Sequence, residues 1–565
     1  MPVSMLVEAQ MTLDALYASK QIGASAYHFG LTIMRAQTDG NCAAGMLAAL
    51  CFQAASQGHS CLDSATWHGV YCPVLIESIA EKIELDLIFA DNALVTQANL
   101  CINDCLLVID GRKLYLQKYW QMERALFEQL HSRINSTAIL RTGDSAHDLA
   151  MICLQKPLAL LTGGPGSGKT TTISRALITW IQAFYQNHQR RPNIILCAPT
   201  GKAAARMNAA WSAQKPALLA LLEPAWHDAL PGPAQTLHRL LAINTNTRQA
   251  RFNADNPLNA DLLVLDEASM VDMQLLLQLL LALESRTHLL LVGDPNQLPS
   301  IDAGNVLGAL ITHASNGGLF TGLDSTHVFL THNYRQQQNP GLAALTQDCL
   351  TESAESLTEL IAGNQYPNVQ FRALDNTAIT AVIADATQFY RQLATLDSAQ
   401  SALLQLDQRM ILTPVRAGPI GCITLNNEIA QRLSNKAQYH GQVVMITENS
   451  APLKLSNGDI GILWQNGEQL SAYFMQGDEL CSFDLGKLPA FELAYALTIH
   501  KAQGSEYRHV DLLLPNDDLP LLSKALIYTA ITRARNSLRV IADKNIFRQS
   551  LDRTLQRMNG FNMPH

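Results

Sequence analysis

A glycine-rich turn in the first half of the chain could hold the phosphates of a nucleotide. Gly163 is followed by four residues and then by Gly168, Lys169 and Thr170, which is the spacing of a P-loop. Glycines let successive backbone N–H groups point at phosphate oxygens, the lysine reaches the β- and γ-phosphates, and the threonine hydroxyl binds Mg²⁺. An apolar run, 158–161, precedes the turn and a helical pattern follows it. This order of strand, loop and helix favours a nucleotide site over an ordinary flexible turn. The residues expected to contact the nucleotide are Gly163, Gly164, Pro165, Gly166, Ser167, Gly168, Lys169, Thr170 and Thr171.

Two acidic residues follow a second apolar run. The run 262–265 places Asp266 and Glu267 at its carboxyl end. Asp266 would hold Mg²⁺ together with Thr170, and Glu267 would orient or deprotonate the attacking water. An Asp-Glu pair alone is common on protein surfaces, but this one ends an apolar strand about 100 residues after the P-loop. The pair therefore indicates nucleotide hydrolysis.

Three further side chains could complete hydrolysis. Gln297 follows the apolar run 288–292, and its amide could touch both the γ-phosphate and the bound water. Arg335 and Arg533 lie in the other half of the chain, and a guanidinium can stabilise charge on the transferring phosphoryl group. A single arginine is more often a solvated surface group. The role of these two arginines therefore depends on the motifs that accompany them.

Other polar residues suit contacts with sugar and phosphate groups. Gly504 and Glu506, in the polar loop that follows the run 496–499, are expected to bind the nucleotide. Phosphate-contacting donors at strand ends could also position a nucleic-acid backbone. The residues expected to contact DNA are Pro199, Thr200, Lys202, Arg206, Thr236, His238, Arg416, Thr498, His500 and Lys501.

Composition sets broad limits on the protein. The chain has 565 residues, of which 48% are hydrophobic, and its formal net charge is −8. This charge argues against a protein held to nucleic acid by global charge, but a groove needs only local basic residues. The sequence shows no signal peptide and no apolar stretch of about 18 residues, so we expect a cytoplasmic protein without membrane contact.

Eleven cysteines raise the question of a metal site. Six of them fall in the first 105 residues, but none forms a C-x-x-C pair. We favour scattered core thiols over an iron–sulfur or zinc site, which remains the alternative.

The order of predicted elements divides the chain into three domains. A helical region, 1–135, contains an Asp-Gly hairpin near residue 110 and helices at 42–57 and 74–86. Strands alternate with helices over 136–348, with strands at 158–161, 193–198, 262–265 and 288–292. A second α/β domain covers 349–565, with strands at 410–413, 509–513 and 538–542, and short alternating strands at about 438–490 predict an inserted β-barrel.

Taken together, the motifs resemble those of superfamily 1 DNA helicases. GGPGSGKTT, APTGKAAARM, TLHRLL, LDEASMVD, VGDPNQLPS, NYRQ, TIHKAQGSEY and YTAITRAR occur in this order. NPLNADLLVLDEASMVD, NGDIGIL, the hairpin LLVIDGRKLYLQKYW and the short N-terminal region narrow the resemblance to RecD, the family of α-subunits of exodeoxyribonuclease V. The resemblance implies two RecA-like domains, an SH3-like β-barrel insertion and a mainly helical, partner-binding N-terminal domain.

The same resemblance implies an activity and partners. Such proteins use ATP and Mg²⁺ to move 5′ to 3′ along single-stranded DNA. They act at DNA ends in double-strand break repair and recombination, with RecB-like and RecC-like subunits in a heterotrimer. A stand-alone RecD-like helicase and a nucleotide-binding scaffold subunit remain the alternatives. The chain departs from related helicases in one place, since it has no glutamine between Gln129 and Gln155, where an adenine-reading residue is expected.

Overall fold

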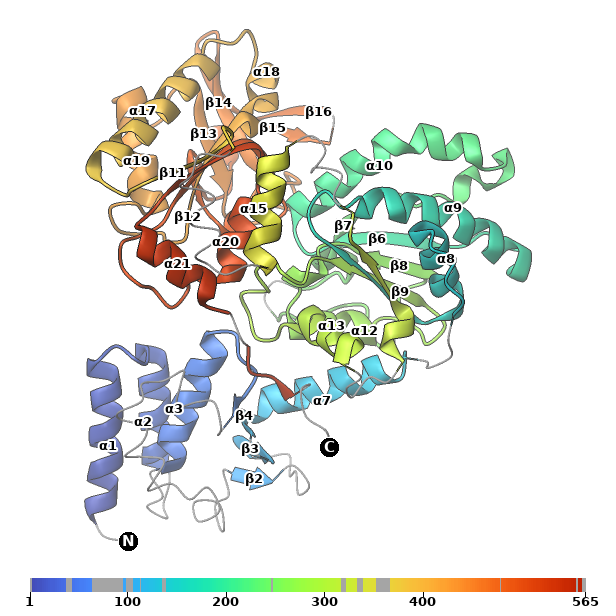
Figure 1. Ribbon diagram of the computed structural model, residues 1–565, viewed down its shortest axis with the longest axis horizontal. Helices are drawn as coiled ribbons and strands as arrows, with labels where there is room; N and C mark the ends of the chain where they lie inside the picture. Colours follow the sequence, from blue (N-terminus) through green and yellow to red (C-terminus); the bar gives the residue numbers. More distant parts are fainter. Residues whose placement is uncertain are drawn as a thin grey trace.

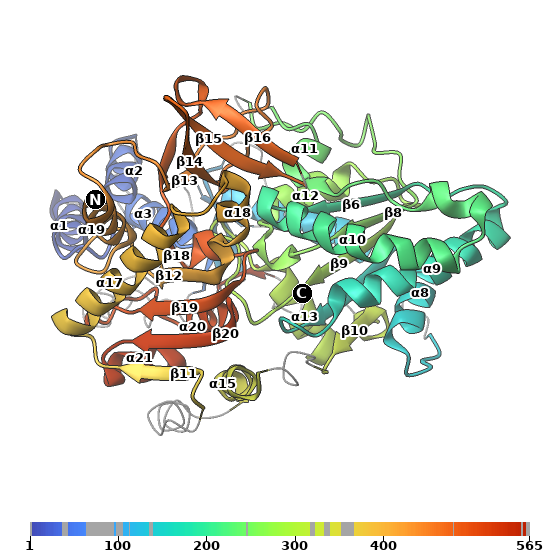
Figure 2. The same ribbon diagram turned by 90° about the horizontal axis from the view of Figure 1, so that it is seen from above.

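The structure is a computed structural model of the chain. It describes residues 3–36, 43–63, 95–97, 105–111, 113–134, 139–244, 247–316, 322–332, 339–351, 366–477, 479–554 and 557–560. Figure 1 shows the helical N-terminal region set apart from the larger α/β part of the molecule. Figure 2 shows two sheets of this larger part side by side.

The first α/β domain is built on a parallel sheet. Within the described residues its strands run in the order β10-β5-β9-β8-β6-β7, and all their pairings are parallel. Apolar residues fill the central strands, as expected for a sheet covered on both faces. The strands are β5 (Leu158–Gly163), β6 (Ile194–Ala198), β7 (Gln235–Thr236), β8 (Leu262–Leu265), β9 (His288–Gly293) and β10 (His327–Leu330). The strand predictions at 158–161, 193–198, 262–265 and 288–292 are thus confirmed to within a residue or two.

Helices cover both faces of this sheet (Figure 1). One core contains side chains of α8 (Ser145–Gln155), α9 (Lys169–His188) and α10 (Gly201–Leu221). The opposite core contains side chains of α7 (Gln117–His131), α12 (Met273–Leu281) and α13 (Val306–Asn316). Asp272 caps α12 by accepting a hydrogen bond from the Leu275 amide at 2.8 Å. The face that carries α7 therefore includes a helix expected in the N-terminal domain.

A second parallel sheet forms the other α/β domain. In the part of the chain that the structure describes, its strand order is β11-β20-β19-β12-β18. The strands are β11 (Val369–Arg372), β12 (Arg409–Thr413), β18 (Ala496–Thr498), β19 (Tyr507–Leu513) and β20 (Ala534–Ile541). Its principal helices are α15 (Pro340–Thr351), α17 (Asn376–Leu393), α19 (Cys422–Leu433), α20 (Lys524–Ile531) and α21 (Lys544–Asp552). The predicted strands 410–413, 509–513 and 538–542 lie within or overlap β12, β19 and β20.

The boundary expected after residue 348 falls inside α15. Leu342, Leu345 and Cys349 of this helix belong to the core of the second domain, and α15 packs against α20. The change of domain therefore precedes Pro340. The polar run RQQQN and the Asn339-Pro340 pair that follows are the local signal for this boundary, which the prediction placed too late.

An antiparallel sheet is inserted into the second domain. Its described strands run in the order β16-β15-β14-β13-β17, and each pairing is antiparallel. They are β13 (Gln442–Ile446), β14 (Ile460–Asn466), β15 (Gln469–Gln476), β16 (Glu479–Asp484) and β17 (Phe491–Leu493). Gly467 closes the β14–β15 hairpin at a φ of 60°, a conformation that glycine adopts readily.

The N-terminal region combines helices with a small sheet. The helices α1 (Val3–Ala18), α2 (Ala24–Ala36) and α3 (Ala43–Ser56) pack together. Beside them lie β1 (Leu62–Asp63), β2 (Val95–Gln97), β3 (Leu107–Asp110) and β4 (Lys113–Leu116). The antiparallel pairing of β3 with β4 confirms the predicted hairpin, and α3 confirms the helix at 42–57. The helix expected at 74–86 lies outside the described residues.

The described cysteines of this region are buried free thiols. Cys51, Cys61 and Cys105 are not linked to one another, and burial raises the pKa of the Cys51 thiol well above its usual value. Among the described residues, histidine, cysteine and carboxylate side chains form no cluster that could hold a metal ion. The other three early cysteines, Cys42, Cys72 and Cys101, lie outside the described part of the chain.

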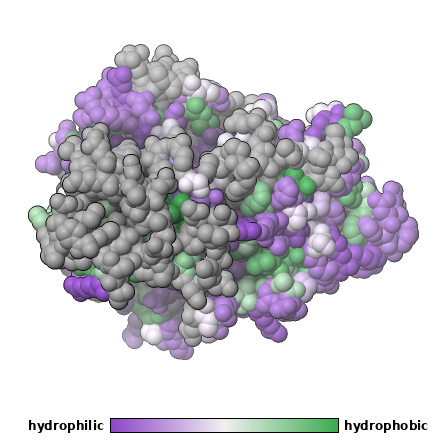
Figure 3. Space-filling view, turned by 90° about the horizontal axis from the view of Figure 1, so that it is seen from below, coloured by the Kyte–Doolittle hydropathy of each residue, from purple (hydrophilic) through white to green (hydrophobic). Residues whose placement is uncertain are grey.

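The surface of the molecule is mixed in character. On the face drawn in Figure 3, hydrophilic side chains predominate in the coloured area, and hydrophobic ones form small groups between them. None of the described helices is both long enough and apolar enough to cross a membrane.

Candidate nucleotide site between the two parallel sheets

The P-loop has the geometry of a phosphate cradle. It connects the end of β5 to the start of α9, and Gly166 and Gly168 take φ values of 78° and 83°. Only glycine adopts this left-handed conformation at low cost, which explains why glycine occupies both positions. The Lys169 ammonium donates to the carbonyl oxygens of Gly163 at 2.6 Å and Gly164 at 3.2 Å, so it is folded over the loop.

The loop opens into a cavity of about 860 Å³. Groups from both α/β domains line this cavity, including most of the residues that the sequence assigns to nucleotide hydrolysis. They are Pro165 to Thr171, Asp266, Glu267 and Gln297 from the first domain, and Glu506 and Arg533 from the second. The structure therefore brings these residues together, and the cavity is large enough for a nucleotide.

The two acidic residues lie where β8 ends. Asp266 is half-buried at the cavity, and burial together with the charge of Glu267 raises the pKa of its carboxyl to about 6, although Lys169 opposes this. Glu267 has a φ of 53°, a left-handed conformation that a non-glycine residue adopts only with strain. Its amide donates to Asp266 Oδ1 at 2.9 Å. This backbone kink turns two neighbouring carboxylates toward the same cavity.

Gln297 is held beside Asp294 and faces the second domain. Its Nε2 donates to Asp294 Oδ2 at 3.2 Å, and the same oxygen accepts from the Tyr528 hydroxyl at 2.9 Å. The Leu298 amide donates to Thr529 Oγ1 at 2.8 Å. Through Tyr528 and Thr529, α20 of the second domain contacts the loop that carries Gln297.

Arg533 reaches the cavity from the end of α20. Its side chain is fixed by hydrogen bonds from Nε to the Thr529 carbonyl and from Nη1 to the Ser505 carbonyl, both at 3.1 Å. The residue is only 1% exposed, so its charge is held in a low-dielectric setting where it acts strongly on nearby phosphate. Arg335 cannot be placed, because it lies outside the described residues.

Two buried polar atoms at the cavity fit a missing ligand. Ser167 Oγ and Gln297 Oε1 are enclosed and have no hydrogen-bond partner within the described structure. Buried polar groups normally have partners, so such orphans indicate groups that a ligand would satisfy. A nucleoside triphosphate with its divalent cation matches this set of residues, because the P-loop supplies donors and Asp266 with Thr170 supplies oxygen ligands.

One end of the cavity shows the consequence of the absent glutamine. Ala146, which stands 17 residues before Gly163, lines the cavity together with Gly143. It has no side-chain amide to read a base. Asp148 instead accepts hydrogen bonds from the Thr142 amide and hydroxyl, each at 2.8 Å, and so fixes the loop next to the cavity.

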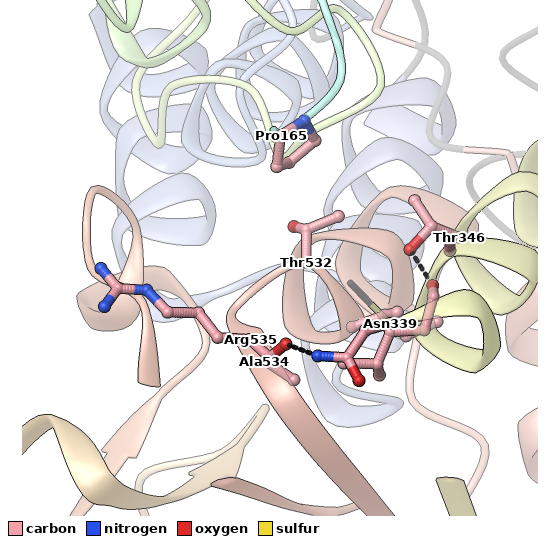
Figure 4. A pocket seen from close by; sticks show the side chains of 9 residues that line it. Pro165, Asn339, Thr346, Thr532, Ala534 and Arg535 are labelled. Carbon is pink, nitrogen blue, oxygen red and sulfur yellow. Dashed lines mark hydrogen bonds between the residues drawn. The ribbon is translucent and has the colours of Figure 1, made fainter. Parts of the chain in front are cut away.

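A smaller cavity of about 20 Å³ lies on the other side of Pro165. Figure 4 shows Pro165 on one side and Thr532, Ala534 and Asn339 on the other, with the Arg535 side chain extending away from them. Asn339 Nδ2 donates to the Arg535 carbonyl at 2.6 Å. The P-loop is therefore packed against the second domain outside the nucleotide cavity as well.

The residues expected to contact DNA are spread over several settings. Thr200 and Thr236 cap α10 and α11 (Leu237–Leu240), because their hydroxyls accept from the Ala203 and Arg239 amides at 3.2 Å. These two threonines therefore have a structural role. The others in this group are Pro199 after β6, His238 exposed on α11, Thr498 buried at the end of β18 and His500 half-buried after it.

Three of the basic residues expected to contact DNA lie near two carboxylates, Glu492 and Asp459. They are Lys202, Arg416 and Lys501. The Lys501 ammonium lies 2.5 Å from a Glu492 oxygen, and Arg416 lies 3.6 Å from the other. The Lys202 ammonium is enclosed without a hydrogen-bond partner in the described structure, and burial lowers its pKa to about 8 despite Asp459. Lys202 and Lys501 face each other closely enough to interact electrostatically, which forms a local basic site at the junction of the two domains.

Arg206 lies elsewhere, in the nucleotide cavity. It pairs with Glu506, which the sequence assigned to nucleotide binding. Sequence reasoning placed Arg206 with the DNA contacts because it belongs to the same motif as Lys202. Residues four apart lie on the same side of a helix but about 6 Å apart along its axis, and this step along α10 carries Arg206 into the nucleotide cavity. Tyr528 was missed, because no local pattern links it to the site.

Comparison with known proteins agrees with this architecture. Residues 148–303 match the model of an AAA domain, and residues 493–541 match that of the UvrD-like helicase C-terminal domain. The "RecBCD enzyme subunit RecD" of Mycolicibacterium smegmatis is 31% identical over 94% of this chain and 94% of its own length. The Haemophilus influenzae protein of the same name is 33% identical over 72% of this chain and 70% of its length. The "ATP-dependent RecD2 DNA helicase" of Deinococcus radiodurans is 31% identical over 67% of this chain and 46% of its length.

The P-loop, the Asp-Glu strand end and a second α/β domain that closes the cavity define a two-domain helicase of superfamily 1. Within that class, the sequence identity to RecD subunits and the share of the chain that they cover identify the family. The chain belongs to the family of RecD subunits of RecBCD enzymes.

Proposed function

We propose that this chain is the α-subunit of a RecBCD-type helicase–nuclease and moves 5′ to 3′ along single-stranded DNA. As a member of the RecD family it is an ATP-dependent DNA helicase. The observation that carries the motor proposal is the single cavity lined by the P-loop, Glu267 and Arg533, because it joins the hydrolytic groups of two domains. Domain closure around ATP can then alternate the grip on DNA. The 5′-to-3′ direction and the RecB-like and RecC-like partners rest on family resemblance.

The residues of the cavity take distinct roles in this proposal. The P-loop amides and Lys169 bind the phosphates, while Thr170 and Asp266 hold Mg²⁺, which neutralises phosphate charge when bound. Glu267 orients and deprotonates the attacking water, and Gln297 contacts the γ-phosphate. Arg533 and, by family resemblance, Arg335 stabilise the charge that develops during transfer. Gly504 and Glu506 bind the nucleotide from the side of the second domain.

The remaining parts of the chain have roles in the same proposal. Residues 1–135 form the partner-binding domain, although α7 at its end packs on the first motor domain. The antiparallel sheet of residues 442–493 forms an SH3-like barrel next to the DNA path. Lys202 and Lys501, at the domain junction, bind the DNA backbone. Residues 136–348 and 349–565 are the two RecA-like domains, with the start of the second moved to before Pro340.

A DNA-stimulated ATPase assay tests the proposal. The purified chain and its Lys169→Gln variant are compared with and without single-stranded DNA and with and without candidate partner subunits. We expect DNA to stimulate wild-type hydrolysis and the variant to lose it by at least about 100-fold. Absence of DNA-stimulated hydrolysis under every condition contradicts the motor and favours the nucleotide-binding scaffold.

Two further measurements separate the helicase alternatives. Displacement of streptavidin from a biotin at the 3′ end of the strand, but not at the 5′ end, is expected for 5′-to-3′ movement. Strong unwinding by the isolated chain favours a stand-alone helicase instead. Unwinding that appears only with the partner subunits supports the heterotrimer.

A further inference from the structure

An ion pair crosses the nucleotide cavity from one domain to the other. Arg206 lies on α10 of the first domain, and Glu506 immediately precedes β19 of the second. The Arg206 guanidinium pairs with Glu506 Oε1, while the other carboxylate oxygen accepts from Arg535 Nε at 3.0 Å. The Glu506 side chain is 3% exposed, so this carboxylate is almost fully removed from water. Both of its oxygens are thus held by arginines.

The backbone around the pair also joins the two domains. Gly504, two residues before Glu506, has a φ of 73°, and a Cβ placed on it would lie 3.6 Å from the Ala203 amide nitrogen. The start of α10 therefore packs directly on the loop that carries Glu506. Two successive contacts, Gly504 on Ala203 and Glu506 on Arg206, join the same helix to the same loop.

The first-domain end of this pair faces the hydrolytic carboxylates. Burial alone would lower the pKa of Arg206, but the charges of Glu506, Glu267 and Asp266 outweigh burial and raise it. An arginine presents five N–H donors in a planar fork, so it can hold one carboxylate while its remaining edge attracts others. Arg206 therefore pairs with the carboxylate of the second domain and lines the same cavity as Asp266 and Glu267.

We propose that Arg206 is a positioning residue for ATP hydrolysis, which holds the Glu506 loop of the second domain against the catalytic side of the first. The inference rests on the proposed ATPase function and deepens it. When the cavity is closed, the pair fixes the loop that supports Arg533, since the Ser505 carbonyl accepts from Arg533 Nη1 at 3.1 Å. Loss of the pair lets this loop and Arg533 drift from the γ-phosphate.

This assignment predicts a particular kinetic pattern. A residue that aligns the closed cleft acts on the transition state more than on nucleotide binding, so its removal lowers kcat with a small effect on KM. We expect Arg206→Gln to lower the DNA-stimulated kcat about 10- to 100-fold, with ATP KM and single-stranded DNA affinity each changed less than about 3-fold. Arg206→Lys, which keeps the charge but loses the fork, is expected to recover only part of the rate.

A double-mutant cycle tests whether the pair is the cause. If Arg206 acts through Glu506, the Arg206→Gln/Glu506→Gln double variant loses little more activity than the more affected single variant. The matched control is Arg191→Gln, which breaks the exposed Arg191–Asp228 pair of the same domain and should leave kcat unchanged. Circular dichroism and melting temperature establish that each variant is folded.

Each outcome decides between defined alternatives. An Arg206→Gln variant with normal kcat but weakened DNA binding overturns the inference and returns Arg206 to the DNA contacts. A variant with raised KM and unchanged kcat also overturns it, because Arg206 then contributes ground-state nucleotide binding. If the effects of the two single variants add fully in the double variant, the inference is also overturned. Failure of the wild-type chain to hydrolyse ATP would instead contradict the proposed function, so the two failures are distinguishable.

Discussion

Individual residues at the site are held in costly conformations and environments. Glu267 keeps a left-handed backbone, and Asp266 is a half-buried carboxylate whose pKa is raised by burial and by Glu267. Strain of this kind costs of order 1–3 kcal/mol and persists where the surrounding structure enforces it. Here the apolar strand β8 and the packed loop after it enforce the kink. A bound Mg²⁺ would offset the negative charge of the two carboxylates.

Glu267→Gln tests the role of this carboxylate. The substitution keeps the shape and the backbone but removes the base, so we expect ATP hydrolysis to fall at least about 100-fold while ATP binding persists. Steady-state hydrolysis and binding of a fluorescent ATP analogue measure the two quantities. Loss of binding with intact folding would contradict this role for Glu267.

Burial of the charged Lys202 side chain lowers the stability of the folded protein. Its ammonium is enclosed without a hydrogen-bond partner among the described residues, so the charged form is destabilised and the pKa falls to about 8. A lowered lysine pKa means that the unfolded chain binds the proton more tightly. The penalty is therefore present at neutral pH and disappears as pH rises from about 8 toward about 10.4.

Lys202→Met is expected to stabilise the protein and weaken DNA binding. At pH 7 the variant should raise the free energy of unfolding by about 1–3 kcal/mol, because methionine fills the same space without charge. Urea unfolding at pH 7 and pH 10 should show this gain shrinking at the higher pH. Fluorescence anisotropy with a labelled oligonucleotide should show reduced affinity, and unchanged affinity would contradict a DNA contact at Lys202.

At the scale of elements, α7 packs on the core of the first motor domain while it also contacts the hairpin of the N-terminal region. Leu126 and Leu130 are buried in the core beneath α12. Just beyond the helix, Arg133 donates to the Thr287 and Leu283 carbonyls at 3.0 and 3.1 Å. The guanidinium thus satisfies backbone oxygens at the start of β9 and the end of α12. This helix ties the hairpin of the N-terminal region to the motor.

Truncation of Leu130 should therefore destabilise the motor domain. Leu130 is 0% exposed, so Leu130→Ala is expected to cost about 2–5 kcal/mol of unfolding free energy through lost burial and a cavity. Leu140, which is 89% exposed, provides the control, and Leu140→Ala should change stability by less than about 0.5 kcal/mol. Denaturant unfolding followed by tryptophan fluorescence measures both. Equal, small effects would place α7 outside the motor core.

At the scale of the whole molecule, the C-terminal segment packs against the N-terminal region. The Met558 carbonyl accepts from the Ser60 amide at 3.0 Å, the Asn559 carbonyl accepts from Lys113 Nζ at 2.7 Å, and the Gly560 amide donates to Glu123 Oε1 at 2.7 Å. Burial raises the pKa of Glu123 although these bonds oppose it. In Figure 1 the C-terminal segment passes between the N-terminal region and the motor. It thereby supplies backbone partners to Lys113 and Glu123, two buried charged groups.

Removal of residues 555–565 should loosen the N-terminal region. Lys113 and Glu123 would lose backbone partners, which costs about 1–3 kcal/mol for each unsatisfied buried group. We expect limited proteolysis to release the N-terminal region faster from the shortened chain, while its DNA-stimulated hydrolysis remains. Unchanged proteolysis would show that the N-terminal region is held by other contacts.

The sequence by itself determined the parts of the site that depend on local order. A P-loop requires a strand, a glycine-rich turn and a helix in succession, and the spacing of Gly163, Gly168 and Lys169 specified all three. The Asp266–Glu267 pair and the strands β5, β8 and β9 were predictable for the same reason, because a buried parallel strand is a short apolar run with polar residues after it.

Only the tertiary structure decided which distant residues meet. The pairing of Arg206 with Glu506, the contact of Tyr528 with Asp294, and the packing of α7 and α15 on unexpected domains join segments that are far apart in sequence. Local patterns specify that such residues are polar or apolar, but not their partners. The partners follow from how the two sheets and their helices bury their apolar faces, which is a property of the whole fold.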